Sequence, residues 1–360
     1  MLNISVESTN PVKKKTSVLC GFVLEKTNQV IGLGKTDSKI DQAIRESINE
    51  MEGKFGKISI INTLGKIPAK RILLAGLGQK EKINNDSFRF VAGKIAKEVR
   101  ERNLSDFAII MPNNSVCEPS LVVSQIVEGC KLSLYAFDEY KKANAKKEPN
   151  LAILVSKSPQ VTKTAKSAEK IYNGVIFTKS LANLPPNICT PEMLAKYAKK
   201  LSTKTKIRCK IFTKSELKKN GFGGITAVGQ GSKNEPRLII MEYNGSSKNQ
   251  KPTVIVGKAV TFDTGGSSLK PGEKLDECGG CTVFGIMKAV ESLRLPLNVI
   301  GIVPSVENMP GGESYRPGDI IKLYSGKTAE ILNTDAEGRL ILADALAYAE
   351  KHYSPKEIID

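Results

Sequence analysis

One segment, residues 331–340, reads ILNTDAEGRL and joins an apolar run to a helical pattern through a charged turn. We expect a strand over residues 329–332 and a helix that begins near Leu340. The turn between them then holds Asp335 and Glu337 at the carboxyl end of a strand, which is where open α/β folds bind ligands. The alternative is that these carboxylates only cap the helix that follows. The segment therefore predicts an α/β chain with a candidate site in this turn.

A second segment, residues 253–271, reads TVIVGKAVTFDTGGSSLKP. Its first four residues predict a buried strand, which ends at a glycine. Lys258, Asp263 and Lys270 then follow in a loop rich in Gly and Ser. A lysine near carboxylates is often only a surface ion pair, and this is the alternative for the loop by itself. Taken together, the two segments predict carboxylates and lysines that gather in one site.

These segments resemble the leucyl aminopeptidases, the dinuclear metallo-aminopeptidases of peptidase family M17. The octapeptide NTDAEGRL matches the signature of that family without a change, and GKAVTFDTGGSSLKP departs at only a few positions from the usual GKG(I/L)TFDSGG(I/Y)S(I/L)KP. Further matches are AVGQGS at residues 227–232, ENMPGG at 307–312 and YRPGD at 315–319. The resemblance covers about residues 179–360 well and the earlier part loosely. It implies an enzyme that releases N-terminal amino acids, preferentially Leu, from peptides.

Length and composition agree with two domains of the α/β class. The chain has 360 residues, of which 40% are hydrophobic and 6% aromatic, as in ordinary soluble α/β cores. We expect a small N-terminal α/β domain over residues 1–150 and a catalytic domain over 151–360. The catalytic domain should contain a mostly parallel sheet flanked by helices. The lysine-rich polar stretch 138–150 marks the expected boundary.

Hydrophobic periodicity predicts the main elements of both domains. In the first, strands are expected at residues 17–23, 57–61, 71–75 and 106–111, and helices at 86–102 and 119–136. In the second, strands are expected at residues 151–155, 206–212, 237–243, 253–256, 299–303 and 329–332. Helices are expected there at residues 159–183, 283–293 and 340–353. A further helix should begin after Thr190, because that residue, Pro191 and Glu192 provide an N-cap, an N1 proline and an early acid.

The formal net charge is +17, mostly from lysines in residues 13–15, 141–147 and 199–219. Clustered lysines can form a phosphate-binding face, and some members of the resembled family also bind DNA. The chain has no aromatic interleaving, no Arg-rich run and no recognisable nucleic-acid motif, so a solvated lysine-rich surface is the favoured interpretation. A DNA-binding or assembly protein is kept as an alternative function.

Seven cysteines in no regular framework predict thiols in a reducing compartment. Cys278 and Cys281 form a CxxC, which by itself is weak support for zinc or redox chemistry and favours small-residue packing. The first fifteen residues contain no apolar run of signal-peptide length, and no later stretch reaches membrane-spanning length. We therefore expect a cytoplasmic protein that is not a membrane protein.

Metal chemistry is favoured because the residues for other mechanisms are missing. The one histidine, His352, falls late in an expected helix, where it should be solvated or should stabilise the helix end. A Ser/His/Asp or Cys/His mechanism is therefore nearly excluded. The carboxylates and lysines favour a hard divalent ion such as Mn²⁺, Mg²⁺ or Zn²⁺. Two ions close together need bridging carboxylates, for which Asp263 and Glu337 are the candidates.

The resemblance implies roles for the other residues of the site. Asp335 would serve one metal, and Lys258 would serve the other as a neutral amine, because a nearby dication favours that form. Lys270 would stay protonated and stabilise an oxyanion. Arg339 would hold a bicarbonate that relays a proton, and the free α-amine of the substrate would bind a metal. The resemblance also implies a homo-hexamer in which the N-terminal domain packs on its neighbours.

The chain departs from the family pattern in two places. After Lys270 the family reads roughly KPxxxMDEMKxDMxG, whereas this chain has the shorter KPGEKLDECG. If the gap precedes Asp276, that residue is the last metal ligand; if the gap follows Glu277, the ligand is missing. The spacing downstream favours Asp276. The family also continues past Asp360 through an ATLTG segment, so we expect a C-terminally truncated product, and a catalytically impaired remnant is the alternative.

Overall fold

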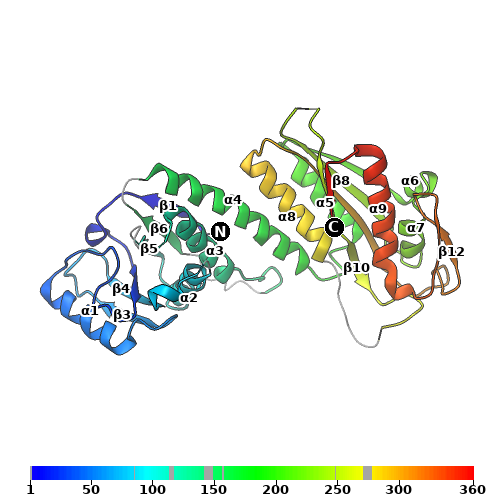
Figure 1. The fold of residues 1–360 in the computed structure, drawn as a ribbon. Coiled ribbons are helices and arrows are strands. Elements are labelled where there is room, and N and C mark those ends of the chain that lie inside the picture. Colours follow the sequence, from blue (N-terminus) through cyan, green and yellow to red (C-terminus); the bar gives the residue numbers. More distant parts are fainter. Residues whose placement is uncertain are drawn as a thin grey trace. The chain divides into compact units, whose positions relative to one another are not determined.

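The computed structural model describes residues 2–84, 86–112, 117–141, 149–155, 158–247, 249–270 and 278–360. The chain divides into two compact units, Met1–Tyr172 and Asn173–Asp360. Each unit has its own sheet with helices against it (Figure 1). The predicted two-domain α/β fold is therefore confirmed. Within the described residues, no helix combines the length and the apolar character that crossing a membrane requires.

The first unit is built on a six-stranded sheet with the order β1-β6-β5-β2-β4-β3. All neighbours are parallel except β3 and β4. The strands are β1 Ile4–Glu7, β2 Leu19–Leu24, β3 Ile58–Asn62, β4 Arg71–Gly78, β5 Asp106–Ile110 and β6 Asn150–Leu154. The helices are α1 Ser38–Met51, α2 Ser87–Glu101 and α3 Pro119–Leu134, with 3-10 turns η1 Pro11–Lys13 and η2 Lys80–Lys82.

The strand expected at residues 151–155 lies in the first sheet and does not open the second domain. As β6 it pairs with β5 on one side and with β1 on the other. The physical reason is that the backbone N–H and C=O groups of β1, near the N-terminus, require hydrogen-bond partners, and the parallel strand β6 supplies them. The sequence pattern shows that this strand is buried but cannot show which sheet buries it.

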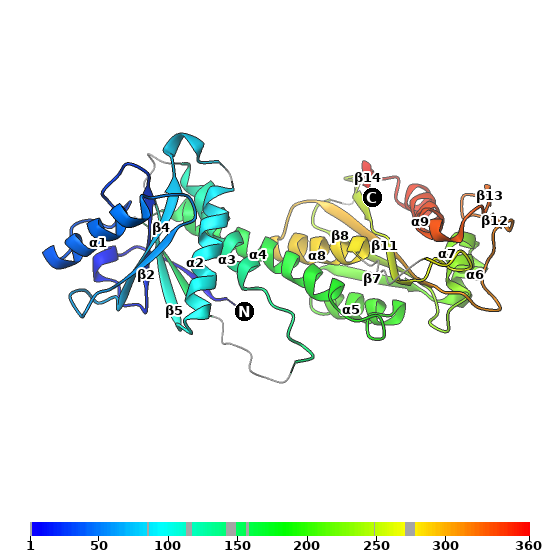
Figure 2. The ribbon, with the colours of Figure 1, turned by 90° about the horizontal axis from the view of Figure 1, so that it is seen from below.

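Alternate residues of the strands face two separate cores in the first unit. One core lies under α1 and includes Ile40, Ile44 and Ile48 of that helix. The other lies under α2 and α3, and α2 contributes Val91 and Ile95 to it. Both faces of the sheet are covered, as expected for parallel strands (Figure 2).

The second unit contains a mixed sheet with the order β14-β9-β11-β8-β7, and β10 pairs with β11 off this path. The pairs β14–β9, β9–β11 and β11–β10 are parallel. Strand β8 is antiparallel to both of its neighbours, β11 and β7. The strands are β7 Ile207–Phe212, β8 Arg237–Asn244, β9 Thr253–Val256, β10 Ala259–Asp263, β11 Asn298–Asn308 and β14 Glu357–Ile359. The helices are α4 Pro159–Ala182, which begins in the first unit, α5 Pro191–Ser202, α6 Lys214–Lys219, α7 Gly223–Gly229, α8 Cys278–Leu293 and α9 Glu337–Tyr353.

The strand expected at residues 329–332 is not part of this sheet. It is the short strand β13 Thr328–Glu330, which pairs with β12 Ile320–Lys322 in a separate antiparallel hairpin. Leu332 is 80% exposed, so only part of the apolar run is buried. The prediction was wrong here because a short apolar run does not reveal whether a long sheet or a hairpin takes it up.

Helices α5 and α8 cover one face of the main sheet, and α7 and α9 cover the other (Figure 2). The start of α8 lies very close to the connection between β9 and β10. A Cβ on Gly257 would lie 2.5 Å from the carbonyl oxygen of Gly279, and the amide of Gly280 donates to the carbonyl of Lys258 at 2.7 Å. This close approach fixes the backbone of Lys258.

Candidate metal centre

Asp263 is the last residue of β10, so it lies at the end of a strand and not in the loop where we expected it. Its side chain is buried, and its Oδ1 accepts hydrogen bonds from the amide of Gly265 and from Nδ2 of Asn308, both at 2.9 Å. Asn308 is the last residue of the neighbouring strand β11 and is paired with Asp263 in the register. Two parallel strands therefore end together and hold this carboxylate in one orientation.

The second pair of carboxylates comes from the turn before α9. A 3-10 turn, η3 Thr334–Ala336, leads directly into the helix, which begins at Glu337 and not near Leu340 as predicted. The side chain of Asn333 accepts the amide of Asp335 at 2.8 Å and starts this turn. Glu337 is 2% exposed, whereas Asp335 is exposed. The 3-10 turn therefore orients the side chain of Asp335, and the first turn of α9 orients that of Glu337.

Thr334 joins this turn to the loop that follows Asp263. Its hydroxyl donates to the carbonyl of Gly265 at 2.6 Å and accepts the amide of Ser268 at 2.8 Å. Its carbonyl accepts from Asn308 Nδ2 at 3.0 Å and from the hydroxyl of Tyr315 at 2.6 Å. Sequence reasoning did not assign a role to these residues. Asn308 and Tyr315 lie in ENMPGG and YRPGD, so the motif matches were the available signal.

Glycine is required where the loop passes over this contact. Gly265 and Gly266 have φ values of +85° and +66°, which other residues rarely adopt. A Cβ on Gly266 would also lie 2.7 Å from Asn308 Oδ1 and 2.9 Å from Thr334 Oγ1. The pair of glycines therefore permits the loop to bring Lys270 back toward Asp263.

The three carboxylates form one cluster with two lysines. Asp263, Asp335 and Glu337 each offer an oxygen, and these oxygens lie within 4.8 Å of one another. Lys270 Nζ is 2.5 Å from Asp263 Oδ2 and 2.9 Å from Asp335 Oδ1. Lys258 Nζ is 3.1 Å from Glu337 Oε1. Five of the seven predicted site residues therefore meet in one place.

The electrostatics of the cluster favour a bound cation. Burial raises the pKa of Glu337, and the nearby Asp263 raises it further, while Lys258 lowers it. Burial lowers the pKa of Lys270, but its hydrogen bonds to Asp263 and Asp335 outweigh this and raise the pKa, so the lysine stays protonated. Within the described part of the chain, Oε2 of Glu337 is buried and has no hydrogen-bond partner. A buried carboxylate oxygen without a partner is costly unless a cation or a donor approaches it.

Gly338 lets the amine of Lys258 approach the start of α9. A Cβ at this position would lie 2.8 Å from Cδ of Lys258 and 3.4 Å from its Nζ. The glycine of NTDAEGRL is therefore needed for side-chain packing, because its position in the helix does not require a positive φ.

The other predicted residues are less well placed. Asp276 lies outside the described residues. Arg339 is exposed on α9, and among the described residues its side chain makes no ion pair. His352 is exposed near the opposite end of α9, where its Nε2 lies 2.8 Å from the hydroxyl of Tyr324. It is roughly 22 Å along the helix from Glu337, at about 1.5 Å per residue, so it does not take part in the cluster.

Fold and cluster together define an α/β protein with a carboxylate and lysine site suited to hard divalent cations. Residues 176–360 match the model of the cytosol aminopeptidase family, catalytic domain, and residues 22–144 match that of its N-terminal domain. A probable cytosol aminopeptidase from Cenarchaeum symbiosum is 57% identical over 364 residues, covering 100% of this chain and 73% of that protein. A cytosol aminopeptidase from Pseudomonas aeruginosa is 38% identical and covers 99% of this chain and 74% of its own length.

Solved structures agree with these matches. A lysine-to-glutamate mutant of tomato leucine aminopeptidase has a TM-score of 0.85 at 28% identity and covers 100% of this chain and 73% of its own. The bottromycin maturation enzyme BotP in complex with Mn has a TM-score of 0.80 at 25% identity, over 95% of this chain and 71% of its own. The chain belongs to the cytosol aminopeptidase family. It is a metal-dependent aminopeptidase, a hydrolase that acts on peptides.

Proposed function

We propose that the protein binds two divalent ions and removes N-terminal residues, preferentially Leu and other apolar residues, from peptides. The observation that carries the proposal is the cluster of Asp263, Asp335 and Glu337, with a buried oxygen of Glu337 that lacks a partner in the described chain. Asp263 and Glu337 would bridge the two ions, Asp335 would bind one and Lys258 the other. Asp276 is proposed as a further ligand. Mn²⁺ and Zn²⁺ both suit this set of donors.

The ions, when bound, would polarise the scissile carbonyl and lower the pKa of a water. The remaining work falls to side chains of this chain. Lys270, held protonated by two carboxylates, would donate hydrogen bonds to the oxygen on which charge develops. The free α-amine of the peptide would bind one of the ions, which limits cleavage to the first residue. Asn308 would keep Asp263 in the same orientation throughout the reaction, because it donates to the carboxylate and to the turn of Thr334 together.

Arg339 is proposed as the site of an anion that relays a proton, with bicarbonate as the candidate. Two observations support this role. The only histidine lies at the other end of α9, and the guanidinium of Arg339 is exposed, with no carboxylate partner in the described part of the chain. A guanidinium in that state can hold a planar oxyanion through two parallel hydrogen bonds.

A homo-hexamer and a cytoplasmic location complete the proposal. The location is supported by the curated relatives, which are named cytosol aminopeptidases, and the hexamer is what the resemblance to the leucyl aminopeptidases implies. Analytical ultracentrifugation of the full chain measures the oligomeric state, and we expect a species of six chains. If that species dissociates into smaller units, the peptidase activity of each species has to be measured separately.

The test is hydrolysis of Leu-p-nitroanilide by protein from which metal has been removed and to which Mn²⁺ or Zn²⁺ is returned. We expect turnover only after metal is added. Lys270→Ala should reduce kcat by a factor of about 100 to 1000, because a donor to the developing oxyanion is lost. Lys327→Ala is the matched control, since Lys327 is exposed and lies outside the cluster.

Two results would contradict the proposal. One is metal-independent turnover, and the other is equal loss of activity in Lys270→Ala and Lys327→Ala.

Substrate preference is measured by replacing Leu with Ala, Asp and Lys in the same p-nitroanilide, and we expect the highest kcat/KM for Leu. Bicarbonate dependence is measured in buffer freed of carbon dioxide, where Arg339→Ala should abolish any stimulation by added bicarbonate.

A further inference from the structure

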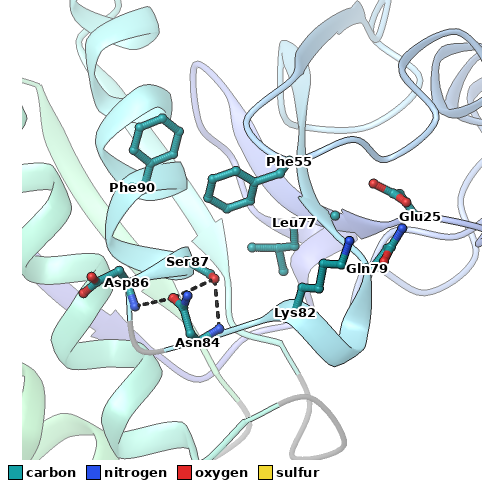
Figure 3. Close-up of a pocket in the computed structure, with 10 residues that line it drawn as sticks. Glu25, Phe55, Leu77, Gln79, Lys82, Asn84, Asp86, Ser87 and Phe90 are labelled. Carbon is teal, nitrogen blue, oxygen red and sulfur yellow. Dashed lines mark hydrogen bonds between the residues drawn. The ribbon is translucent and has the colours of Figure 1, made fainter.

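The first unit contains a pocket of about 520 Å³ at the end of strand β4. Its floor is Leu77, one side is the start of α2, and the opposite side is the segment that follows β2 (Figure 3). Gly78 also lines it. Pockets for small molecules in proteins are of this size and commonly lie at the carboxyl ends of parallel strands. Nothing in the proposed peptidase chemistry uses this pocket.

One wall of the pocket is an exposed aromatic pair. Phe55 and Phe90 are 49% and 51% exposed, and their rings stack with centroids 5.2 Å apart. Backbone geometry holds this pair in place, because Gly78 has a φ of +76° and a Cβ there would lie 3.2 Å from Cβ of Phe55. Below the rings lies the buried Leu77 (Figure 3). The wall therefore offers rigid apolar surface to a ligand side chain.

The polar residues of the pocket divide into two groups. Asn84, Asp86 and Ser87 bond to one another: Asn84 Oδ1 accepts from the amide of Asp86 at 2.9 Å, and Ser87 accepts the amide of Asn84 at 3.0 Å. Asp86 is also paired with Arg89 at 2.5 Å. These groups are satisfied and form the start of α2.

The second group is Glu25, Gln79 and Lys82, which lie together across the pocket from the rings (Figure 3). In the described part of the chain, none of these three side chains makes a hydrogen bond or an ion pair. Glu25 is half-buried, and Gln79 and Lys82 are exposed. An acid, an amide and an amine that face the same space without pairing are available to a ligand that carries both charges.

The balance of charge selects the ligand class. Among the lining residues, Glu25 and Lys82 carry opposite charges, and Asp86 is neutralised by Arg89. Lys54 also acts electrostatically on Glu25, but it is itself paired with Glu52 at 2.8 Å. A nucleotide phosphate would meet Glu25 at the polar end, and a simple cation would meet Lys82, so neither is favoured. A zwitterion with an apolar body fits both the charges and the aromatic wall.

We propose that this pocket binds a free α-amino acid with an apolar side chain. Its ammonium would donate to Glu25, its carboxylate would accept from Lys82 and Gln79, and its side chain would lie against Phe55, Phe90 and Leu77. Such amino acids are also what the proposed peptidase releases, but binding here does not depend on that activity.

The test uses the full chain after metal removal, titrated with L-phenylalanine in a calorimeter. A ligand of this size in a partly open pocket should bind with a Kd on the order of 1 mM. N-acetyl-L-phenylalanine, L-phenylalaninamide and L-serine lack the ammonium, the carboxylate and the apolar side chain in turn, and each should bind at least about tenfold more weakly.

Variants connect the binding to this pocket. Glu25→Gln and Phe90→Ala should each weaken L-phenylalanine binding about tenfold or more, and thermal melts should show that both still fold. Glu81→Gln is the matched control, because Glu81 is exposed beside the pocket without lining it. Lys270→Ala should leave binding unchanged, which separates this pocket from the metal centre, and Glu25→Gln should leave peptidase activity unchanged.

Three outcomes would overturn the proposal. The first is no heat of binding up to 20-fold above the expected Kd, or equal binding by Glu25→Gln and the unmodified chain. The second is loss of binding in Lys270→Ala, which would place the amino acid at the metal centre. The third is dissociation of an oligomer in Phe90→Ala, measured by light scattering, which would show that the aromatic pair packs against another copy of the chain.

Discussion

Two buried carboxylates on the same helix differ in how their oxygens are satisfied. Glu337 is the first residue of α9 and Asp344 lies two turns later, and they are 2% and 0% exposed. Both oxygens of Asp344 have partners: Oδ2 accepts the amide of Ile225 at 2.9 Å and Oδ1 accepts that of Tyr324 at 2.7 Å. Glu337 has one oxygen on Lys258 and one with no partner in the described chain.

The difference separates a structural acid, whose oxygens are both hydrogen-bonded within the fold, from an acid with one oxygen available to a bound cation. Asp344 uses its two oxygens as hydrogen-bond acceptors that fix the start of α7 and the segment after β12, so its surroundings are complete. Glu337 keeps an unsatisfied oxygen close to Asp263, an arrangement that costs stability in the absence of a cation. The two positions should therefore respond in opposite ways to substitution.

The largest effect is expected at Glu337. Glu337→Gln should lower the metal-dependent kcat/KM by more than about 100-fold, the upper figure for loss of an outer partner of a metal ligand. The melting temperature of the metal-free protein should stay the same or rise, because one of two repelling buried charges is removed. Glu330→Gln, at an exposed position, is the control. A fall in both activity and melting temperature would make Glu337 a structural acid like Asp344.

A smaller loss of activity is expected from the residue beside it. Gly338→Ala adds a methyl group 2.8 Å from Cδ of Lys258 and should displace that amine. We expect kcat/KM to fall by about tenfold, the lower figure for a residue that positions a metal ligand. The helix itself should not suffer, since Ala is a better helix former than Gly. Unchanged kcat/KM would show that Lys258 can move aside without loss.

Asp344 should affect stability and not chemistry. Asp344→Ala leaves buried backbone amides without an acceptor and should lower the free energy of unfolding by about 1–3 kcal/mol. Denaturant titration measures it, and Glu350→Ala, exposed on the same helix, should change it by less than about 0.5 kcal/mol. Activity at a temperature where the variant is folded should remain near that of the unmodified chain; a loss comparable to Glu337→Gln would remove the distinction between the two acids.

The smallest effect is a pH dependence at the same residue. Burial raises the pKa of Asp344 to about 6, against the lowering effect of the amides of Tyr324, Ile225 and Gly224. The folded protein therefore binds a proton more tightly than the unfolded chain. The stability that Asp344 contributes should fall as the pH rises, by about 1 kcal/mol between pH 5 and pH 7. The difference in unfolding free energy between the unmodified chain and Asp344→Ala should shrink over this range, and a constant difference would contradict the shift.

The second unit was predicted well where a motif and a pattern agreed. The strand at residues 253–256 and the helix after Thr190 appear as β9 and α5, and the hydroxyl of Thr190 accepts the amide of Met193 at 3.3 Å. The first unit was predicted only in part. Strand β1 and helix α1 carry no motif, and the pattern of β6 fits either sheet, so its partner could not be known in advance.

The sequence by itself determined the α/β class, the family and five residues that meet in the cluster, because those residues lie in short segments that match the family pattern closely. Only the tertiary structure decided how they are held. The bonds of Asn308 and Thr334 to a strand end, a loop and a turn join segments far apart in the chain, and the space for Lys258 beside Gly338 exists only when two elements pack. Such contacts have no local signature, since hydrogen-bond partners and close approaches are properties of distance in space and not of order along the chain.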